Sequence, residues 1–143
     1  MSTPRRITHL IGHSAWEGTA ERTGDVFNPA TGEVTGKVDF ASKALVDEIV
    51  AKAGVAAAEW GQTSLAKRTQ VLFAFRQLLN DNKERIGAII TSEHGKVTSD
   101  AIGEVTRGLE VAEFACGIPH LLKGGFSENV STQVDAYSIL QPL

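Results

Sequence analysis

The sequence predicts a mixed α/β protein in which short β-hairpins precede a group of helices and an extended segment follows them. Three observations support this fold class. Turn signals separate β-branched stretches between residues 7 and 40. Apolar residues recur at helical spacing between residues 42 and 124, and residues 126–143 are again rich in β-branched and aromatic side chains.

The strongest turn signal in residues 7–40 is NPATGE, from Asn28 to Glu33. Pro29 fixes its own φ, and Gly32 can adopt the positive φ that closes a reversal. Upstream, ITHLIG and AWEGT flank a second turn-like stretch, GHS. We therefore expect two short β-hairpins in this region.

About three helices are expected between residues 42 and 124. Ser42 is a plausible N-cap for the first, which should run to about Trp60. Ser64 could cap the second, which has a possible break at residues 80–82 and ends before Gly95. The third should cover residues 98–115, where an apolar stripe repeats every three to four positions: Ile102, Val105, Leu109, Ala112 and Cys116.

Residues 126–143 are expected to form one extended segment, with a strand from about Val130 to Leu140. A lone strand leaves backbone groups unpaired and needs another sheet edge. The second helix raises the same question, because Val71, Phe73 and Leu78 lie off its main apolar stripe. We therefore expect the chain to be a segment of something larger or an obligate partner in an assembly.

Composition excludes several classes of protein. The chain has 143 residues, of which 42% are hydrophobic and 22% charged, which is typical of a globular domain. A net charge of −3 argues against a dedicated nucleic-acid binder, and Trp16, Trp60 and Tyr137 are expected to pack rather than stack on bases. No apolar run is long enough for a membrane span or a signal peptide, so a cytoplasmic protein is expected.

The stretch GEVTRGLE places Arg107 three residues after Glu104 and three before Glu110. On a helix both acids would lie on the arginine's face, and the simpler interpretation is an exposed ion-pair ladder. The other interpretation is a guanidinium that binds a substrate carboxylate bidentately, with Gly103 and Gly108 allowing close approach. The residues alone favour the ladder, and both interpretations stay open.

The remaining reactive side chains suggest no catalytic or metal site. Cys116, the single cysteine, lies on the apolar face of a predicted helix, so we expect buried packing rather than catalysis. The four histidines show no metal-ligand spacing. Lys96, just after Gly95, is expected to interact with the carbonyls at the preceding helix end.

Several motifs together resemble the N-terminal part of the aldehyde dehydrogenase superfamily, from about Ile7 to Leu143. They are NPATGE, the AAAEW run, RTQVLFAFRQLL, EHGK and GEV. Four longer stretches resemble the CoA-acylating methylmalonate-semialdehyde dehydrogenases in particular: EHGKV, GEVTRGLEVAEFACGIPHLLKG, FSENVST and YSILQPL.

The resemblance implies an α/β aldehyde dehydrogenase-like fold and the NAD-dependent oxidation of malonate or methylmalonate semialdehyde. In this family a cysteine thioester passes its acyl group to coenzyme A, in valine or inositol catabolism. The resemblance further implies that Arg107 binds the carboxylate of the semialdehyde. It also implies homo-oligomers, dimers or tetramers, formed through an extended segment at residues 126–141.

The family's nucleotide-binding fold and nucleophilic cysteine would follow Leu143, and no glycine-rich dinucleotide motif is present. We therefore expect the 143-residue chain to bind neither NAD nor coenzyme A and to be inactive alone. The alternative is a non-catalytic, truncated helical module that acts in assembly or interaction.

Overall fold

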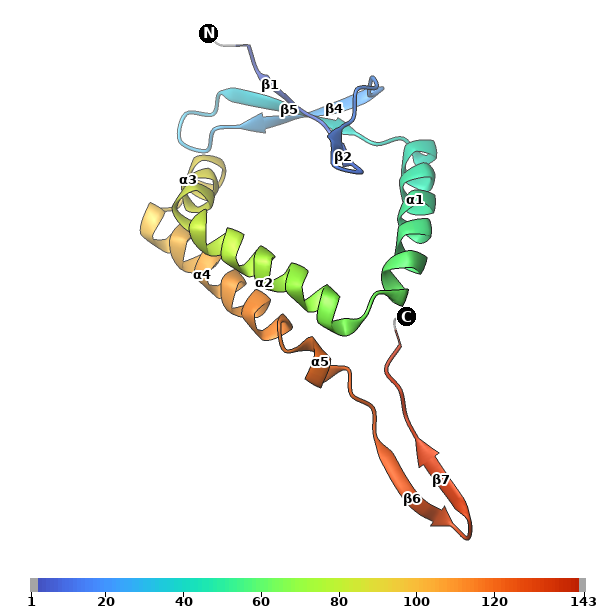
Figure 1. Cartoon of the computed structure of the whole chain (residues 1–143). Helices are drawn as coiled ribbons and strands as arrows, with labels where there is room; N and C mark the ends of the chain where they lie inside the picture. Colours follow the sequence, from blue (N-terminus) through green and yellow to red (C-terminus); the bar gives the residue numbers. More distant parts are fainter. Residues whose placement is uncertain (1–2, 142–143) are drawn as a thin grey trace. The chain divides into compact units, whose positions relative to one another are not determined.

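The computed structural model describes residues 3–141 (Figure 1). Pro142 and Leu143, at the end of the predicted extended segment, lie outside the described residues. The chain divides into two compact units. The first unit contains the residues up to Gln62 together with Glu84–Glu104, and the second contains Thr63–Lys83 and the residues from Val105 onward.

The strands of the first unit form two small sheets. A three-stranded sheet has the order β1-β5-β4, in which β5 (Val34–Phe40) pairs parallel with β1 (Arg5–Ile7) and antiparallel with β4 (Arg22–Phe27). A separate two-stranded hairpin joins β2 (Leu10–Ile11) to β3 (Ser14–Ala15). The two predicted hairpins are confirmed, whereas the parallel pairing of β1 was not predicted.

The NPATGE turn closes the β4–β5 hairpin as the sequence indicated. Gly32 adopts φ +74°, and its backbone N–H donates to the carbonyl oxygen of Asn28 at 2.8 Å. The Asn28 side chain accepts a further hydrogen bond from the backbone N–H of Ala30 at 2.8 Å. The asparagine therefore caps its own turn, a common role of this residue type.

An ion pair lies on the three-stranded sheet. Asp39 on β5 is buried, and its carboxylate accepts a hydrogen bond from Nε of Arg6 on β1 at 2.8 Å. The Arg6 guanidinium holds the pKa of Asp39 below its ordinary value. Arg6 also donates to the carbonyl oxygen of Gly18 and lies near the ring of Trp16, which is half-buried.

Five helices lie within the described residues: α1 (Lys43–Gln62), α2 (Leu65–Asp81), α3 (Lys83–His94), α4 (Thr98–Ala115) and the short α5 (Ile118–Leu121). The expectation of about three helices was too low. The second predicted helix divides at Asn82, which lies in the stretch where a break was possible. The bounds predicted for the third helix, residues 98–115, are confirmed by α4.

Hydroxyl side chains cap the first two helices. Ser42 Oγ accepts from the backbone N–H of Leu45 at 3.2 Å, and Ser64 Oγ accepts from that of Lys67 at 3.4 Å. Both predicted N-caps are therefore confirmed. Trp60, in the last turn of α1, is 47% exposed and does not pack as predicted.

In the first unit, α3 and the beginning of α4 pack closely at a glycine. A Cβ added to the buried Gly87 of α3 would lie 2.7 Å from Cγ1 of Ile102 on α4. The absence of a side chain at position 87 is what allows this approach. Gly95, with φ +85°, lies just past the end of α3, as predicted.

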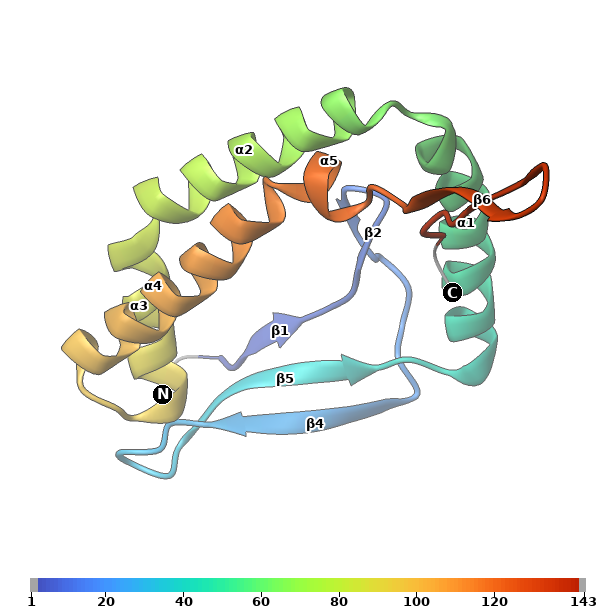
Figure 2. The same ribbon diagram turned by 90° about the horizontal axis from the view of Figure 1, so that it is seen from below.

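In the second unit, α2 and the C-terminal half of α4 lie side by side (Figures 1 and 2). The buried residues are Thr69 from α2 and a stripe from α4 and its C-terminus: Val105, Leu109, Ala112 and Cys116. Arg76 of α2 and Glu113 of α4 form an ion pair at 3.1 Å. Val71, Phe73 and Leu78 are all more than half exposed, so the prediction of a second apolar surface on α2 is confirmed.

The C-terminal segment is a hairpin, so the prediction of one strand from Val130 to Leu140 is wrong. Strands β6 (Phe126–Ser131) and β7 (Val134–Tyr137) pair antiparallel, and the chain reverses between them at residues 132–133. Gln133 adopts φ +61° in this turn. Every residue of the hairpin is exposed, and Tyr137, expected to pack, is 77% exposed. Nothing else in the described chain covers this hairpin.

No helix among residues 3–141 combines the length and the apolar character needed to cross a bilayer.

Candidate functional site

Helix α4 presents two chemically different faces. Its buried face is the apolar stripe on which Val105, Leu109 and Ala112 lie. With 3.6 residues per turn, Arg107 projects from the opposite face, together with Val111 and Phe114. Val111 and Phe114 are 69% and 70% exposed, so the arginine lies beside an uncovered apolar surface on the same helix.

Arg107 is exposed, and no hydrogen bond or ion pair joins its guanidinium to Glu104 or Glu110 in the described part of the chain. The predicted ion-pair ladder is therefore not formed. Glu104 is instead engaged by Lys96, whose Nζ lies 2.5 Å from its Oε1. The interpretation of Arg107 as a carboxylate-binding residue remains a prediction.

Lys96 forms the most extensive charged cluster in the first unit. Besides Glu104, its ammonium group donates to Oδ2 of Asp100 at 2.9 Å, and its side chain is only 16% exposed. The hydrogen bond to Glu104, followed by that to Asp100, raises the pKa of Lys96 above its ordinary value. The sequence analysis placed Lys96 at helix-end carbonyls, whereas the structure pairs it with these side chains.

The helix surface at the two glycines near Arg107 is open. A Cβ added at Gly103 or at Gly108 would meet no atom within 4 Å. Neither glycine is therefore required by packing inside the described structure. The open space beside Arg107 is compatible with the predicted approach of a ligand or another backbone.

Cys116 is placed as the sequence predicted. It is 8% exposed, and its thiol donates to the carbonyl oxygen of Ala112 at 3.3 Å. No cation is paired with it among the described residues.

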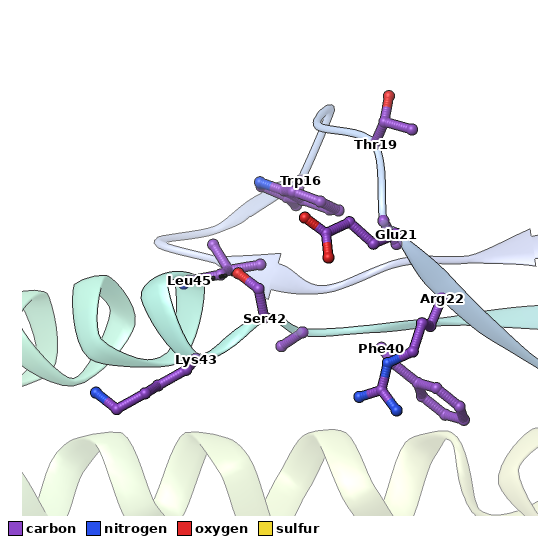
Figure 3. Close-up of a pocket in the computed structure, with 10 residues that line it drawn as sticks. Trp16, Thr19, Glu21, Arg22, Phe40, Ser42, Lys43 and Leu45 are labelled. Atoms are coloured by element: carbon purple, nitrogen blue, oxygen red, sulfur yellow. Dashed lines mark hydrogen bonds between the residues drawn. The ribbon is translucent and has the colours of Figure 1, made fainter.

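A hollow of about 300 Å³ in the first unit was not predicted (Figure 3). It lies where β4 and β5 meet the start of α1, and Trp16 and Leu45 line it. The guanidinium carbon of Arg22 lies 5.8 Å from the centroid of the Phe40 ring, close enough for a cation–π contact. The hollow is lined by two stretches of the sequence, residues 16–22 and 40–45, so no single local motif signals it.

Residues 3–141 contain no group of three or more metal-ligating side chains placed to hold an ion.

Two malonate-semialdehyde dehydrogenases illustrate the sequence relatives of this chain. The protein from Pseudomonas aeruginosa is 46% identical over 122 residues, which cover 85% of this chain and 24% of the relative. The protein from Listeria monocytogenes is 38% identical over 143 residues, which cover 100% of this chain and 29% of the relative. This chain thus spans less than a third of the length of these relatives.

Solved structures agree with the sequence relatives. The methylmalonate-semialdehyde dehydrogenase of Oceanimonas doudoroffii is 41% identical with a TM-score of 0.91, covering 96% of this chain and 28% of that one. A Sinorhizobium meliloti structure, assigned as a methylmalonate-semialdehyde dehydrogenase and complexed with NAD, is 43% identical with a TM-score of 0.93. It covers 100% of this chain and 29% of that one.

The model of the aldehyde dehydrogenase family also matches residues 16–143. Together these findings establish that the chain belongs to the aldehyde dehydrogenase family.

Proposed function

We propose that this chain is the N-terminal part of an NAD-dependent, CoA-acylating dehydrogenase that oxidises malonate or methylmalonate semialdehyde to an acyl-CoA. Support comes from the relatives named malonate-semialdehyde dehydrogenase, which are 38–46% identical to this chain. The chain covers only 24–29% of their length, so the activity is proposed for the full-length protein. A role in valine or inositol catabolism stays a prediction.

The observation that carries the substrate assignment is the guanidinium of Arg107, which has no ion-pair partner among residues 3–141. A semialdehyde of this class has a carboxylate at the end opposite its aldehyde, and a planar guanidinium can bind both oxygens of that carboxylate. Glu104 is occupied by Lys96, and no ion pair joins Glu110 to Arg107 among residues 3–141. We assign Arg107 to substrate binding, not to the chemical step.

NAD and coenzyme A belong to the proposed full-length protein rather than to the described residues. A dinucleotide site usually needs a strand, a glycine-rich turn and a helix in succession. Within residues 3–141, β5 leads into α1 through Ala41 and Ser42, without a glycine. The residues present therefore do not fit a nucleotide site of that kind, and the buried Cys116 is not assigned as the nucleophile.

We propose that the β6–β7 hairpin, within residues 126–141, forms a contact between subunits of a homo-oligomer. A two-stranded hairpin is marginally stable alone and has two edges with unpaired backbone groups. Phe126 and Tyr137 are cross-strand partners, 68% and 77% exposed, and present aromatic surface on one face. Both features favour addition to another sheet, which in a homo-oligomer a second copy supplies.

The proposed function is tested by assaying the full-length protein with NAD, coenzyme A and two aldehydes of matched length. Malonate semialdehyde and propanal differ in that a carboxylate replaces a methyl group. We expect acyl-CoA formation from the semialdehyde. If neither aldehyde gave acyl-CoA, the dehydrogenase assignment would be refuted and a non-catalytic module favoured.

Arg107→Ala tests the substrate-binding residue in the same assay. Hydrogen bonds to charged groups contribute about 1.5–3 kcal/mol, so kcat/KM for malonate semialdehyde should fall roughly ten- to a hundredfold. The kcat/KM for propanal should change little, because propanal has no carboxylate. Arg76→Ala is a matched control, since Arg76 is engaged by Glu113. Equal losses with both aldehydes would contradict the assignment of Arg107.

A further inference from the structure

The first observation is that Lys96 holds Glu104 at a fixed place. Its Nζ lies 2.5 Å from Glu104 Oε1 and 2.9 Å from Asp100 Oδ2, so one ammonium group bridges two carboxylates. The Lys96 side chain is 16% exposed, whereas the Lys52–Glu48 pair of α1 has side chains 63% and 57% exposed. Lys96 is therefore shielded from water in a way that an ordinary surface pair is not.

The backbone explains how Lys96 reaches these acids. Gly95 adopts φ +85° and ends α3, and α4 begins at Thr98, only two residues after Lys96. The lysine side chain can therefore lie along the first turns of α4, where Asp100 and Glu104 are one turn apart.

The second observation is the position of Glu104 relative to Arg107 on the continuous helix α4. An acid three residues N-terminal to a base lies on the same face, and for pairs one turn apart an acid placed before the base forms the better ion pair, in keeping with the helix dipole. Glu104 is thus the acid best placed to neutralise Arg107. Glu110, which follows Arg107, has the less favourable order.

We infer that Lys96 is a positioning residue for substrate binding: by holding Glu104, it keeps the Arg107 guanidinium free for the carboxylate of the semialdehyde. This inference rests on the proposed function. It assigns Lys96 and Glu104 a role in the preference for a carboxylated aldehyde, although neither contacts the substrate.

A purely structural role for Lys96 has different consequences. If the cluster only joined the end of α3 to α4, its loss would affect every substrate alike, and removal of Glu104 would not reverse the loss. The positioning role instead affects only carboxylated aldehydes and is reversed when the competing carboxylate is removed. The two roles are separated by substrate dependence and by rescue.

The test is Lys96→Met in the full-length protein, with KM and kcat measured for malonate semialdehyde and for propanal. We expect KM for the semialdehyde to rise about two- to tenfold, the range from an exposed helical ion pair to a shielded charged hydrogen bond. KM for propanal and kcat for both aldehydes should stay unchanged. Lys96→Arg, which keeps a cation, should keep KM for the semialdehyde near the wild-type value.

Rescue makes the test specific. Lys96→Met combined with Glu104→Gln should restore KM for the semialdehyde, because the amide no longer competes for Arg107. Lys96→Met combined with Glu110→Gln should not restore it. Lys52→Met removes a helical ion pair elsewhere and should leave both KM values unchanged.

The outcomes separate this inference from the proposed function. If Arg107→Ala selectively weakens use of the semialdehyde but Lys96→Met does not, or if Glu104→Gln fails to rescue, the inference is overturned and the proposed function stands. If Arg107→Ala shows no selectivity, the assignment of Arg107 fails first. In an Arg107→Ala background, Lys96→Met should have no additional effect on KM for the semialdehyde.

Discussion

Replacing Gly87 with alanine places a methyl group where α3 meets α4 in the first unit. The added Cβ would lie 2.7 Å from Cγ1 of Ile102 and 3.4 Å from its backbone nitrogen. Carbon atoms pack best at about 3.5–4.0 Å, so the contact must open by roughly 1 Å. Cγ1 is close to the backbone and cannot swing away as a flexible side-chain end can, so the helices must move apart.

The size of the effect follows from two opposing terms. Overpacking a close contact costs about 1–3 kcal/mol, whereas alanine in a helix interior is about 1 kcal/mol more favourable than glycine. Gly87→Ala should therefore lower the free energy of unfolding by roughly 0–2 kcal/mol. Gly54→Ala on α1 is the matched control, because its Cβ would meet nothing within 4 Å. It should stabilise by up to about 1 kcal/mol.

The assay is the urea midpoint of the full-length protein, measured at one subunit concentration for the wild type and both variants. The difference between the two variants isolates the steric term, because helix propensity contributes equally to each. We expect Gly87→Ala to be the less stable by about 1–3 kcal/mol. Equal stability of the two variants would refute the close packing of α3 on α4.

Three other predictions concern the core, the buried ion pair and the cysteine. Leu109→Ala should lower the free energy of unfolding by about 2–5 kcal/mol in urea denaturation. Val111→Ala, on the exposed face, should change it by less than about 0.5 kcal/mol. Similar losses at both positions would contradict the assignment of the α4 faces. Because Arg6 lowers the pKa of Asp39 in the folded state, the ionised carboxylate stabilises the protein above the ordinary value of 3.8, and this stabilisation is lost as pH falls through the lower folded pKa. Below pH 3.8, acid titration should therefore lower the free energy of unfolding less in Asp39→Asn than in the wild type. Identical acid profiles would show that the Arg6–Asp39 pair does not cause the loss of stability. Cys116→Ala should leave kcat for malonate semialdehyde unchanged. Complete loss of activity in this variant would identify Cys116 as the nucleophile.

The elements that the sequence predicted well are those with strong local signals. α4 was located because its apolar stripe keeps the helical period between Gly95 and Gly117. The β4–β5 hairpin was located because Gly32 and its neighbours have the chemistry that a tight turn requires. Local propensity and tertiary structure agree at these places.

The elements that the sequence did not reveal depend on weak turns or on distant pairing. The β6–β7 hairpin reverses at Gln133 with φ +61°, and no glycine or proline marks this turn. β1 pairs with β5, a strand about thirty residues away, so no local pattern predicts it. Trp60 was expected to pack, but periodicity cannot tell whether an apolar face is covered within this chain or by another surface.

The candidate site divides in the same way. Arg107 and its adjacent acids could be identified from the stretch GEVTRGLE, and the burial of Cys116 from the apolar stripe. The pairing of Glu104 with Lys96 could not, because it depends on how Gly95 redirects the chain between α3 and α4. The i,i+4 spacing of Lys96 and Asp100 was the available signal for this cluster.

The most direct test of substrate binding by Arg107 is a crystal structure of the full-length protein with malonate, a dicarboxylate that retains the proposed recognition group. We expect one carboxylate to accept two hydrogen bonds from the Arg107 guanidinium at about 2.7–2.9 Å, with Glu104 still bound to Lys96. A carboxylate bound elsewhere, with Arg107 paired to Glu104 or Glu110, would contradict the assignment.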